Sequence, residues 1–341
     1  MYYFVNDYSE GCTPEILKRL EETNLEKTAP YGADVYSLSA KEKIRKACGA
    51  ENAEVFFLSG GTQTNALMID SLCDDFGAVL CADTGHINAH ESGAVEFTGH
   101  KVIGLFGKDG KLSCKTVSDY MRDFCSNPDR EHMAYPQMIY LSHPTEYGTL
   151  YSKEELKSLY QVAREYSLKL YIDGARLGYG LVCKESDLSL SDIAENCDAF
   201  YIGGTKVGAL FGEAAVFSRG NVPSHMLNRI KRHGALLAKG RITGLQFDTL
   251  FTDGLYEKIA RHAIDCAERL REILRDKGYS FYLETPTNQI FVIVENKKME
   301  ELARKVGFSF WEKLDDDHTV IRFVTSWATD TEDVEALGEV L

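Results

Sequence analysis

The chain has 341 residues, of which 44% are hydrophobic and 26% are charged. This composition is typical of a folded globular protein, and the length favours two domains over one. The 52 acidic and 38 basic side chains give a net charge of −14. Because a phosphate backbone or an anionic membrane surface would be repelled by this charge, we expect neither nucleic acid nor a membrane as a partner.

The beginning of the chain and its cysteines indicate the cell compartment. Residues 1–10 lack the basic and apolar regions of a secretory signal, and apolar runs such as 290–294 are too short to cross a bilayer. Nine cysteines are scattered without a C-x-x-C pair or a Cys/His spacing suited to zinc. We therefore expect a cytoplasmic protein with reduced thiols, no disulfide and no metal site.

The first two thirds of the chain predict an α/β fold. A helix is expected over residues 14–23, with Thr13 as its cap, and the rest of the segment before Glu54 reads as irregular. Short β-branched or aromatic runs then alternate with segments of helical period, such as 65–72 and 153–166. The expected strands are 55–58, 78–81, 101–105, 138–141, 168–172, 199–202 and 214–217. This alternation predicts a mostly parallel seven-stranded sheet covered by helices.

The last hundred residues have a different pattern. A long charged helix over 255–277 is followed by a run at 288–295, a short helix near Met299, a strand pair around Phe308 and Val320, and a final helix from Thr331. We expect a smaller α+β domain over residues 246–341, beside a large domain over residues 1–245.

Residues that follow the strands are candidates for a binding site, because ligands of parallel sheets bind beyond the carboxyl ends of the strands. Lys206 follows one expected strand and is flanked by glycine and threonine, which suits a Schiff base with an aldehyde cofactor. Asp173 ends another strand and would hold a pyridine nitrogen protonated, as pyridoxal 5′-phosphate (PLP) requires to accept electrons. A helix-capping aspartate with a surface arginine is the alternative for Asp173 to Arg176.

A glycine-rich segment and a histidine extend this candidate site. Gly60, Gly61 and Thr62 lie between a strand and a helix, where backbone N–H groups and the helix dipole favour phosphate. An ordinary turn would have the same residues. The segment lacks the residue spacing of the common motifs that bind nucleotide triphosphates or dinucleotides. A nucleotide-dependent enzyme is therefore an alternative that only the glycines support. His86 follows the next strand and could stack on a cofactor ring, move a proton or be purely structural, while His90 lacks a third partner for a metal.

In this order, the motifs resemble the low-specificity L-threonine aldolase and β-eliminating lyase family of fold-type I PLP enzymes. The resemblance covers nearly the whole chain. Its matching segments are Asn6-Asp7, Tyr31 to Tyr36, Gly61-Thr62 with Asn65, His86 with Glu91, Asp173 to Arg176, Thr205-Lys206, Arg241 and Arg322 to Thr325. The chain departs from the family pattern at Asn6, His90 and Val207, which replace a serine, a tyrosine and a small residue.

The resemblance implies a role for each matching residue. The implied catalytic residues are the Schiff-base lysine Lys206, the pyridinium partner Asp173 and the ring-stacking His86, and these also bind the cofactor. Further implied cofactor contacts are Gly61, Thr62, Arg176, Thr205 and Arg241. The implied substrate contacts are Asn6, His90, Arg176 and Arg322. Members of the family are homotetramers (dimers of dimers) with active sites at a dimer interface, so Arg241 is expected to reach a neighbour's cofactor.

The implied reaction is cleavage of the Cα–Cβ bond of L-threonine, L-allo-threonine or a related β-hydroxy amino acid to glycine and an aldehyde. In this reaction His86, or a water that it orients, would take the proton of the β-hydroxyl group. β-Elimination or transamination on the same fold is the alternative activity. A non-catalytic protein with this fold, binding a small molecule, is a further alternative.

Overall fold

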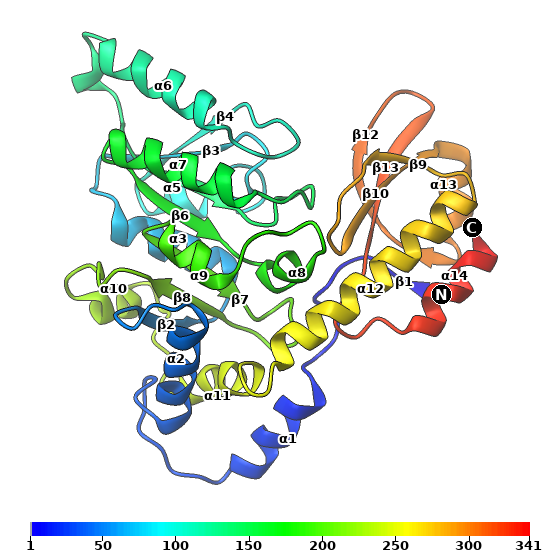
Figure 1. Cartoon of the computed structure of the whole chain (residues 1–341), viewed down its shortest axis with the longest axis horizontal. Helices are drawn as coiled ribbons and strands as arrows, with labels where there is room; N and C mark the ends of the chain where they lie inside the picture. The colour runs from blue at the N-terminus through cyan, green and yellow to red at the C-terminus, as the bar shows by residue number, and fades with distance from the viewer. Residues whose placement is uncertain (1) are drawn as a thin grey trace.

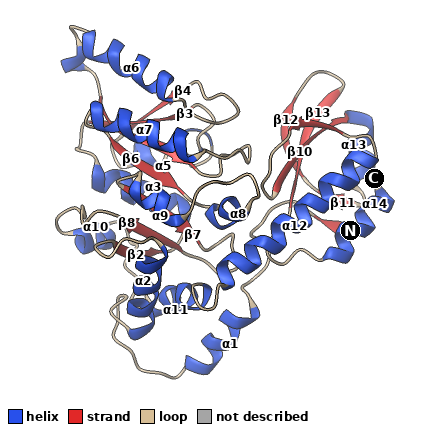
Figure 2. Cartoon of the chain, viewed as in Figure 1, coloured by secondary structure: helices blue, strands red, loops and turns tan. Residues whose placement is uncertain are grey.

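The computed structural model describes residues 2–341, which form a larger and a smaller part (Figure 1). Helix α12 (Leu255–Asp276) runs from one part to the other. The larger part contains a seven-stranded sheet and the smaller part a four-stranded sheet, and helices pack against both (Figure 2). A bilayer-spanning helix, with the necessary length and apolar character, does not occur among residues 2–341.

The seven-stranded sheet confirms the predicted fold class. Its strands, in spatial order, are β2 (Glu54–Leu58), β8 (Glu213–Phe217), β7 (Ala199–Gly203), β6 (Lys169–Asp173), β5 (Tyr135–Ser142), β3 (Gly77–Ala82) and β4 (Lys101–Leu105). Strand β8 is antiparallel to both of its neighbours, β2 and β7, and the other neighbouring strands are parallel to each other. All seven expected strands are present, and the carboxyl ends of β5, β6 and β7 lie side by side at one edge.

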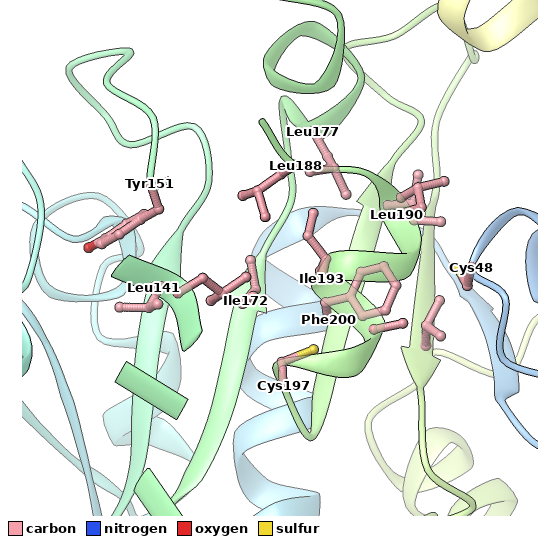
Figure 3. Packing of buried hydrophobic residues seen from close by; sticks show 14 of the residues in the cluster. Cys48, Leu141, Tyr151, Ile172, Leu177, Leu188, Leu190, Ile193, Cys197 and Phe200 are labelled. Atoms are coloured by element: carbon pink, nitrogen blue, oxygen red, sulfur yellow. The ribbon is translucent and has the colours of Figure 1, made fainter. Parts of the chain in front are cut away.

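Strands β3, β7 and β8 are buried at every residue because helices cover both faces of the sheet. On one face, Ile172 and Phe200 lie near Ile193, in a buried cluster that also contains Leu141 and Leu190 (Figure 3). Each such side chain contributes about 1.5–3 kcal/mol by its burial. The main covering helices are α3 (Gly61–Leu72), α6 (Cys114–Ser126), α7 (Lys153–Glu165), α8 (Leu177–Val182) and α9 (Leu190–Glu195). The other helices of this part are α1 (Pro14–Thr23), α2 (Val35–Ala47), α4 (His86–Ala89), α5 (Ala94–Phe97), η1 (Arg130–His132), α10 (Met226–Arg232) and α11 (Arg241–Leu250).

Two predictions about the N-terminal segment are wrong. Residues after α1 are not all irregular, because α2 forms there, capped by the Asp34 side chain, which accepts a hydrogen bond from Ser37 N at 2.8 Å. The buried face of α2 consists mainly of small residues, so its helical period is weak in the sequence. Thr13 precedes α1 as expected, but its side chain makes no capping hydrogen bond; Pro14 supplies a preset φ angle at the start instead.

The smaller part is an antiparallel sheet covered by helices. Its strands, in spatial order, are β12 (Ser309–Lys313), β13 (His318–Val324), β10 (Gln289–Glu295) and β9 (Ser280–Leu283). Helices α13 (Asn296–Ala303) and α14 (Thr331–Val340) complete it together with α12. The start of the chain also lies here, because β1 (Tyr2–Tyr3) pairs with β11 (Val306–Gly307), so both termini are in the smaller part (Figure 1).

The expected domain boundary at residue 245 falls inside α11. This helix packs against α2, and its residues from Thr243 to Leu250 are buried. We propose that the large domain ends after α11, in residues 251–254, and that residues 2–7 belong with the small domain.

Candidate active site

A cavity of about 200 Å³ lies beyond the carboxyl ends of β5, β6 and β7. The predicted site residues that line it are Gly61, Thr62, His86, Asp173, Arg176, Thr205 and Lys206. Asn6, His90, Arg241 and Arg322 are not part of its lining. The strand-end argument therefore brought together a compact group from four separate segments of the sequence.

Lys206 lies in a tight turn after β7. The backbone N–H groups of Gly204 and Thr205 both donate to the carbonyl of Gly212, at 3.0 and 3.1 Å. The Tyr179 hydroxyl donates to the Lys206 carbonyl at 2.5 Å. Burial, followed by the nearby charge of Arg176, lowers the pKa of the Lys206 amine. A lowered pKa increases the fraction of neutral amine, which is the form that attacks an aldehyde.

Asp173 ends β6 and is held by donors from three elements. Tyr140 OH and Asn65 Nδ2 donate to its Oδ2 at 2.6 and 2.8 Å, and Tyr201 OH donates to its Oδ1 at 2.5 Å. Burial alone would raise the pKa of Asp173, but His86 and these hydrogen bonds lower it. The side chain is therefore a carboxylate, as a protonated pyridine nitrogen requires. The sequence analysis missed Tyr140 and Tyr201, although two-residue alternation along the strands places them on the same face as Asp173.

His86 follows β3, as expected, and is the first residue of the short helix α4. Its Nδ1 lies 2.7 Å from Glu91 Oε1, and Asn65 Nδ2 bridges that oxygen to Asp173 at 2.7 and 2.8 Å. Burial alone would lower the pKa of His86, but the hydrogen bond to Glu91 and the charge of Asp173 raise it. His90 is exposed, and its ring centroid lies 5.6 Å from that of His86.

The N-terminus of α3 forms an open cradle. The helix begins at Gly61, four residues before the predicted start, and its first N–H groups have no partner within the helix. A Cβ atom added at Gly60 would meet nothing within 4 Å, and one at Gly61 would meet only the Tyr201 side chain, with its hydroxyl at 3.1 Å. The cradle therefore has room for an anion against the positive end of a helix dipole. Together with an amine, a carboxylate and an imidazole, it fits the groups of PLP.

Arg176 is paired inside the protein. Its Nε and Nη2 donate to the two carboxylate oxygens of Asp7 at 2.7 and 3.0 Å. Asn288 Nδ2 also donates to Asp7 Oδ2, at 2.9 Å, so this carboxylate joins the two parts of the molecule. Asp7 was not among the predicted site residues, although it follows Asn6 in a motif that the resemblance includes.

Arg322 lies on β13 and has neutral hydrogen-bond partners. Its Nη1 donates to Gln289 Oε1 at 2.8 Å, its guanidinium lies 5.3 Å from the Trp311 ring centroid, and its Nε has no hydrogen-bond partner within residues 2–341. Burial lowers the pKa of Arg322 to about 10. The side chain therefore remains a cation near neutral pH, with a donor left for an anionic ligand.

The other two predicted residues outside the cavity bond to nearby groups. Asn6 Oδ1 accepts from Tyr8 N and Ser9 Oγ, both at 2.9 Å. Arg241 donates to the Thr23 carbonyl at 3.0 Å, at the N-terminus of α11. Within one chain, Arg241 does not reach the cavity, so its expected contact with a neighbouring cofactor stays a prediction.

Two buried glutamates line the cavity and were missed from the sequence. Glu213 Oε1 accepts from Thr205 Oγ1 at 2.7 Å, and burial raises the pKa of Glu213 to about 8. Glu146 Oε1 accepts from the His86 backbone N–H at 2.8 Å, and burial also raises the pKa of this carboxyl group. An acid at the start of the otherwise apolar run 213–217 was the available signal for Glu213.

Known proteins are similar to this chain in both sequence and fold. The family model described as beta-eliminating lyase matches residues 4–297. A low-specificity L-threonine aldolase of Pseudomonas aeruginosa is 30% identical over 341 residues, with 98% of this chain and 95% of that protein covered. The solved structure of a Leishmania major threonine aldolase is 37% identical and superposes with a TM-score of 0.96, with 100% of this chain and 98% of that chain covered.

A more distant structure shares the fold alone. The histidinol-phosphate aminotransferase of Clostridium acetobutylicum is 14% identical and has a TM-score of 0.75, with 100% of this chain and 98% of that chain covered. The fold is thus that of the fold-type I PLP enzymes, in agreement with the groups that the cavity presents. The chain belongs to the beta-eliminating lyase family, whose members are PLP-dependent enzymes.

Proposed function

We propose that the chain is a PLP-dependent aldolase that cleaves the Cα–Cβ bond of L-threonine, L-allo-threonine or a related β-hydroxy amino acid to glycine and an aldehyde. The observation that carries this proposal is the convergence of Lys206, Asp173 and His86 on one cavity. The likeness over nearly the full chain to threonine aldolases of Pseudomonas aeruginosa and Leishmania major supports the same reaction.

The proposed cofactor contacts follow from the chemistry of the lining. When bound, PLP supplies an electron sink for the bond that breaks at the α-carbon. We assign the Lys206 amine to the aldehyde of the cofactor, the Asp173 carboxylate to its ring nitrogen and the His86 ring to stacking. The phosphate contacts we assign to Gly61, Thr62 and Thr205.

The proposed substrate contacts select which bond breaks. Arg322 is a buried cation whose described partners are neutral, so we assign the substrate carboxylate to it. Arg176 is already neutralised by Asp7 and would contribute hydrogen bonds rather than a free charge. Asn6 and His90 are further proposed substrate contacts. A fixed carboxylate limits rotation about the bond to the α-carbon, and this orientation decides between cleavage reactions.

We also propose a homotetramer, built as a dimer of dimers, that resides in the cytoplasm. Large apolar side chains that are exposed in the single chain support an interface between copies; they include Tyr8, Tyr31, Leu38 and Leu227. In such an assembly Arg241 would reach the cofactor of the partner subunit. Small-angle scattering and sedimentation of the purified protein test the stoichiometry.

A second activity, β-elimination, is favoured by the description of the matching family model. Transamination would use the same cofactor contacts and remains the other alternative. Both differ from the aldolase reaction in the bond that is aligned at the α-carbon, so their products distinguish the three activities.

The test measures cofactor and products on the same preparation. We expect purified protein with bound PLP to absorb light at the short-wavelength end of the visible range. We also expect it to release glycine and acetaldehyde from L-threonine. Lys206→Ala should lose the absorbance band that borohydride reduction removes in the wild type. Pyruvate with ammonia would indicate β-elimination instead, and bound cofactor without turnover of any amino acid would indicate a binding protein.

A further inference from the structure

Glu146 is an acidic side chain in the lining of the cavity, next to His86. It lies in the turn that follows β5, is 9% exposed and lines the cavity together with His86 and Lys206. Its two carboxylate oxygens differ. Oε1 accepts from the His86 backbone N–H at 2.8 Å and from Ser142 Oγ at 2.5 Å, whereas Oε2 is buried with no hydrogen-bond partner among residues 2–341.

The two hydrogen bonds to Oε1 hold the side chain in place, while Oε2 has no hydrogen-bond partner among residues 2–341. A buried acceptor without a partner costs free energy unless a ligand or water satisfies it. Because Oε1 is anchored by two donors, the position of Oε2 is set before any ligand arrives. Because Glu146 lines the cavity, a carboxylate held in this way is suited to accept a proton from a bound ligand.

His86, the residue that the sequence suggested as the base, is less suited to that role. Its Nδ1 is engaged by Glu91 at 2.7 Å, and its pKa is raised above the ordinary value, so the ring is held toward its protonated form. A protonated imidazole has no lone pair for an incoming proton. The pKa of Glu146 is also raised, mainly by burial, which makes its ionised form a stronger base than an ordinary carboxylate. The charged groups facing Glu146 are His86 from α4 and Asp173 from β6.

We propose that Glu146, through Oε2, is the catalytic base that removes the proton of the substrate β-hydroxyl group. This inference rests on the proposed aldolase function. The hydroxyl O–H bond breaks and its proton passes to Glu146, while the carbon–oxygen double bond of the aldehyde forms. The Cα–Cβ bond breaks at the same time, and its electron pair stays on the side of the α-carbon. Loss of the proton from Glu146 to water, and uptake of one proton by the α-carbon as glycine forms, balance the reaction.

The decisive variant is Glu146→Gln in the holoenzyme. A glutamine oxygen can still accept from the His86 N–H and Ser142, but the amide that replaces Oε2 cannot take a proton. We expect aldehyde release from L-threonine to fall by about 10²- to 10⁴-fold. Exchange of the glycine α-proton, which involves no hydroxyl group, and the absorbance change on glycine binding should stay close to wild type.

Two further variants separate catalysis from structure. In Glu146→Ala, added formate should restore part of the aldehyde release, because a small carboxylate can occupy the vacated space. Glu154→Gln, on the exposed side of α7, serves as the matched control and should behave as wild type. Circular dichroism and cofactor absorbance report whether each variant is folded and loaded.

Each outcome decides the inference. Aldehyde release by Glu146→Gln within about threefold of wild type would overturn it, since the base must then be another group. A parallel loss of glycine exchange and threonine cleavage would also overturn it, because Glu146 would then only position His86. If the wild type binds PLP but releases no aldehyde from any β-hydroxy amino acid, the proposed function is itself wrong and this inference falls with it.

Discussion

Asp7 and Arg176 form a buried ion pair in which two guanidinium nitrogens face two carboxylate oxygens. Asp7 is fully buried and Arg176 nearly so, and Asn288 adds a third hydrogen bond to the carboxylate. Charges in such a place are stable only in each other's presence. Burial alone would raise the pKa of Asp7, but Arg176 and Lys206 lower it, so the carboxylate stays ionised at neutral pH.

Replacing one partner of this pair should destabilise the fold. We expect Asp7→Asn to reduce the free energy of unfolding by about 3–5 kcal/mol, because Arg176 would remain buried without a counter-charge. Urea unfolding of the apoprotein at pH 7 measures this. Asp316→Asn is the control, since its pair with Lys313 is exposed and should not contribute measurably. Equal stability of the two variants would contradict the prediction.

Glu213 should make the stability of the apoprotein depend on pH. Its pKa is about 8 in the folded protein, against about 4.5 in the unfolded chain, so between these values the folded state binds more protons. Stability should therefore fall as pH rises from about 5 to about 8. The variant Glu213→Gln should not show this loss. Between about pH 5 and pH 8, we expect the free energy of unfolding of the wild type to fall by about 1–4 kcal/mol relative to that of the variant.

The comparison isolates Glu213 because the other titrating groups are common to both proteins. Those that face it are Lys206 after β7, Asp173 and Tyr171 on β6, Tyr201 on β7 and Tyr256 on α12. Urea midpoints at pH 5, 6, 7 and 8 give the two profiles. Parallel profiles would show that Glu213 is ionised throughout.

At the scale of elements, the sequence was sufficient where burial is continuous. Strands such as β7 and β8, buried at every residue, appear as apolar runs, apart from Glu213 at the start of β8, and were located correctly. Helix α2 was missed because only Ser37, Ala40 and Ile44 are buried in it. A helix face of small residues differs little in hydrophobicity from the opposite face. The helix that α2 packs against, α11, lies about 200 residues later in the sequence, so a local pattern does not reveal the contact.

The candidate site was predictable only in part, for a related reason. Lys206 and Asp173 are marked by their places after strands, whereas Tyr140 and Tyr201 look like ordinary core aromatics. Their contact with Asp173 depends on β5, β6 and β7 being neighbours, which the spatial order of the strands decides. Sequence patterns give the strands but not their order.

The junction between β6 and β7 should not tolerate a side chain at Gly174. A Cβ atom there would lie 2.0 Å from the Tyr201 carbonyl oxygen, so the two strand ends that carry Asp173 and Lys206 would have to separate. We expect Gly174→Ala to reduce the free energy of unfolding by about 3 kcal/mol and to weaken cofactor binding. Urea unfolding and PLP titration measure these effects.

A matched glycine provides the control for that prediction. A Cβ atom at Gly11 would meet only Leu210 Cδ2, at 3.9 Å, and the backbone there is not in the left-handed region. Gly11→Ala should leave stability unchanged or raise it slightly, because alanine restricts the unfolded chain. If Gly174→Ala were as stable as Gly11→Ala, the packing at Gly174 would be looser than described and the prediction would be wrong.

Across the whole molecule, the first residues of the chain close the small domain and lead into the active site. Phe4 packs against Phe323 with the ring centroids 6.4 Å apart, and its backbone N–H and carbonyl bond to Gly307 and Val324, each at 2.9 Å. Three residues later Asp7 reaches Arg176. The fold therefore couples a terminal segment of the chain to the site.

This arrangement predicts that Phe4 matters far more than its neighbour. Phe4 is 1% exposed and Tyr3 is 53% exposed. We expect Phe4→Ala to lower the free energy of unfolding by about 3–5 kcal/mol, whereas Tyr3→Ala should have little effect. Because loosening residues 2–7 also frees Asp7, Phe4→Ala should raise the glycine concentration needed for half-saturation of the holoenzyme, measured by absorbance. A destabilised Phe4→Ala protein with wild-type glycine affinity would contradict this coupling, since it would show that Asp7 keeps its place without the strand that precedes it.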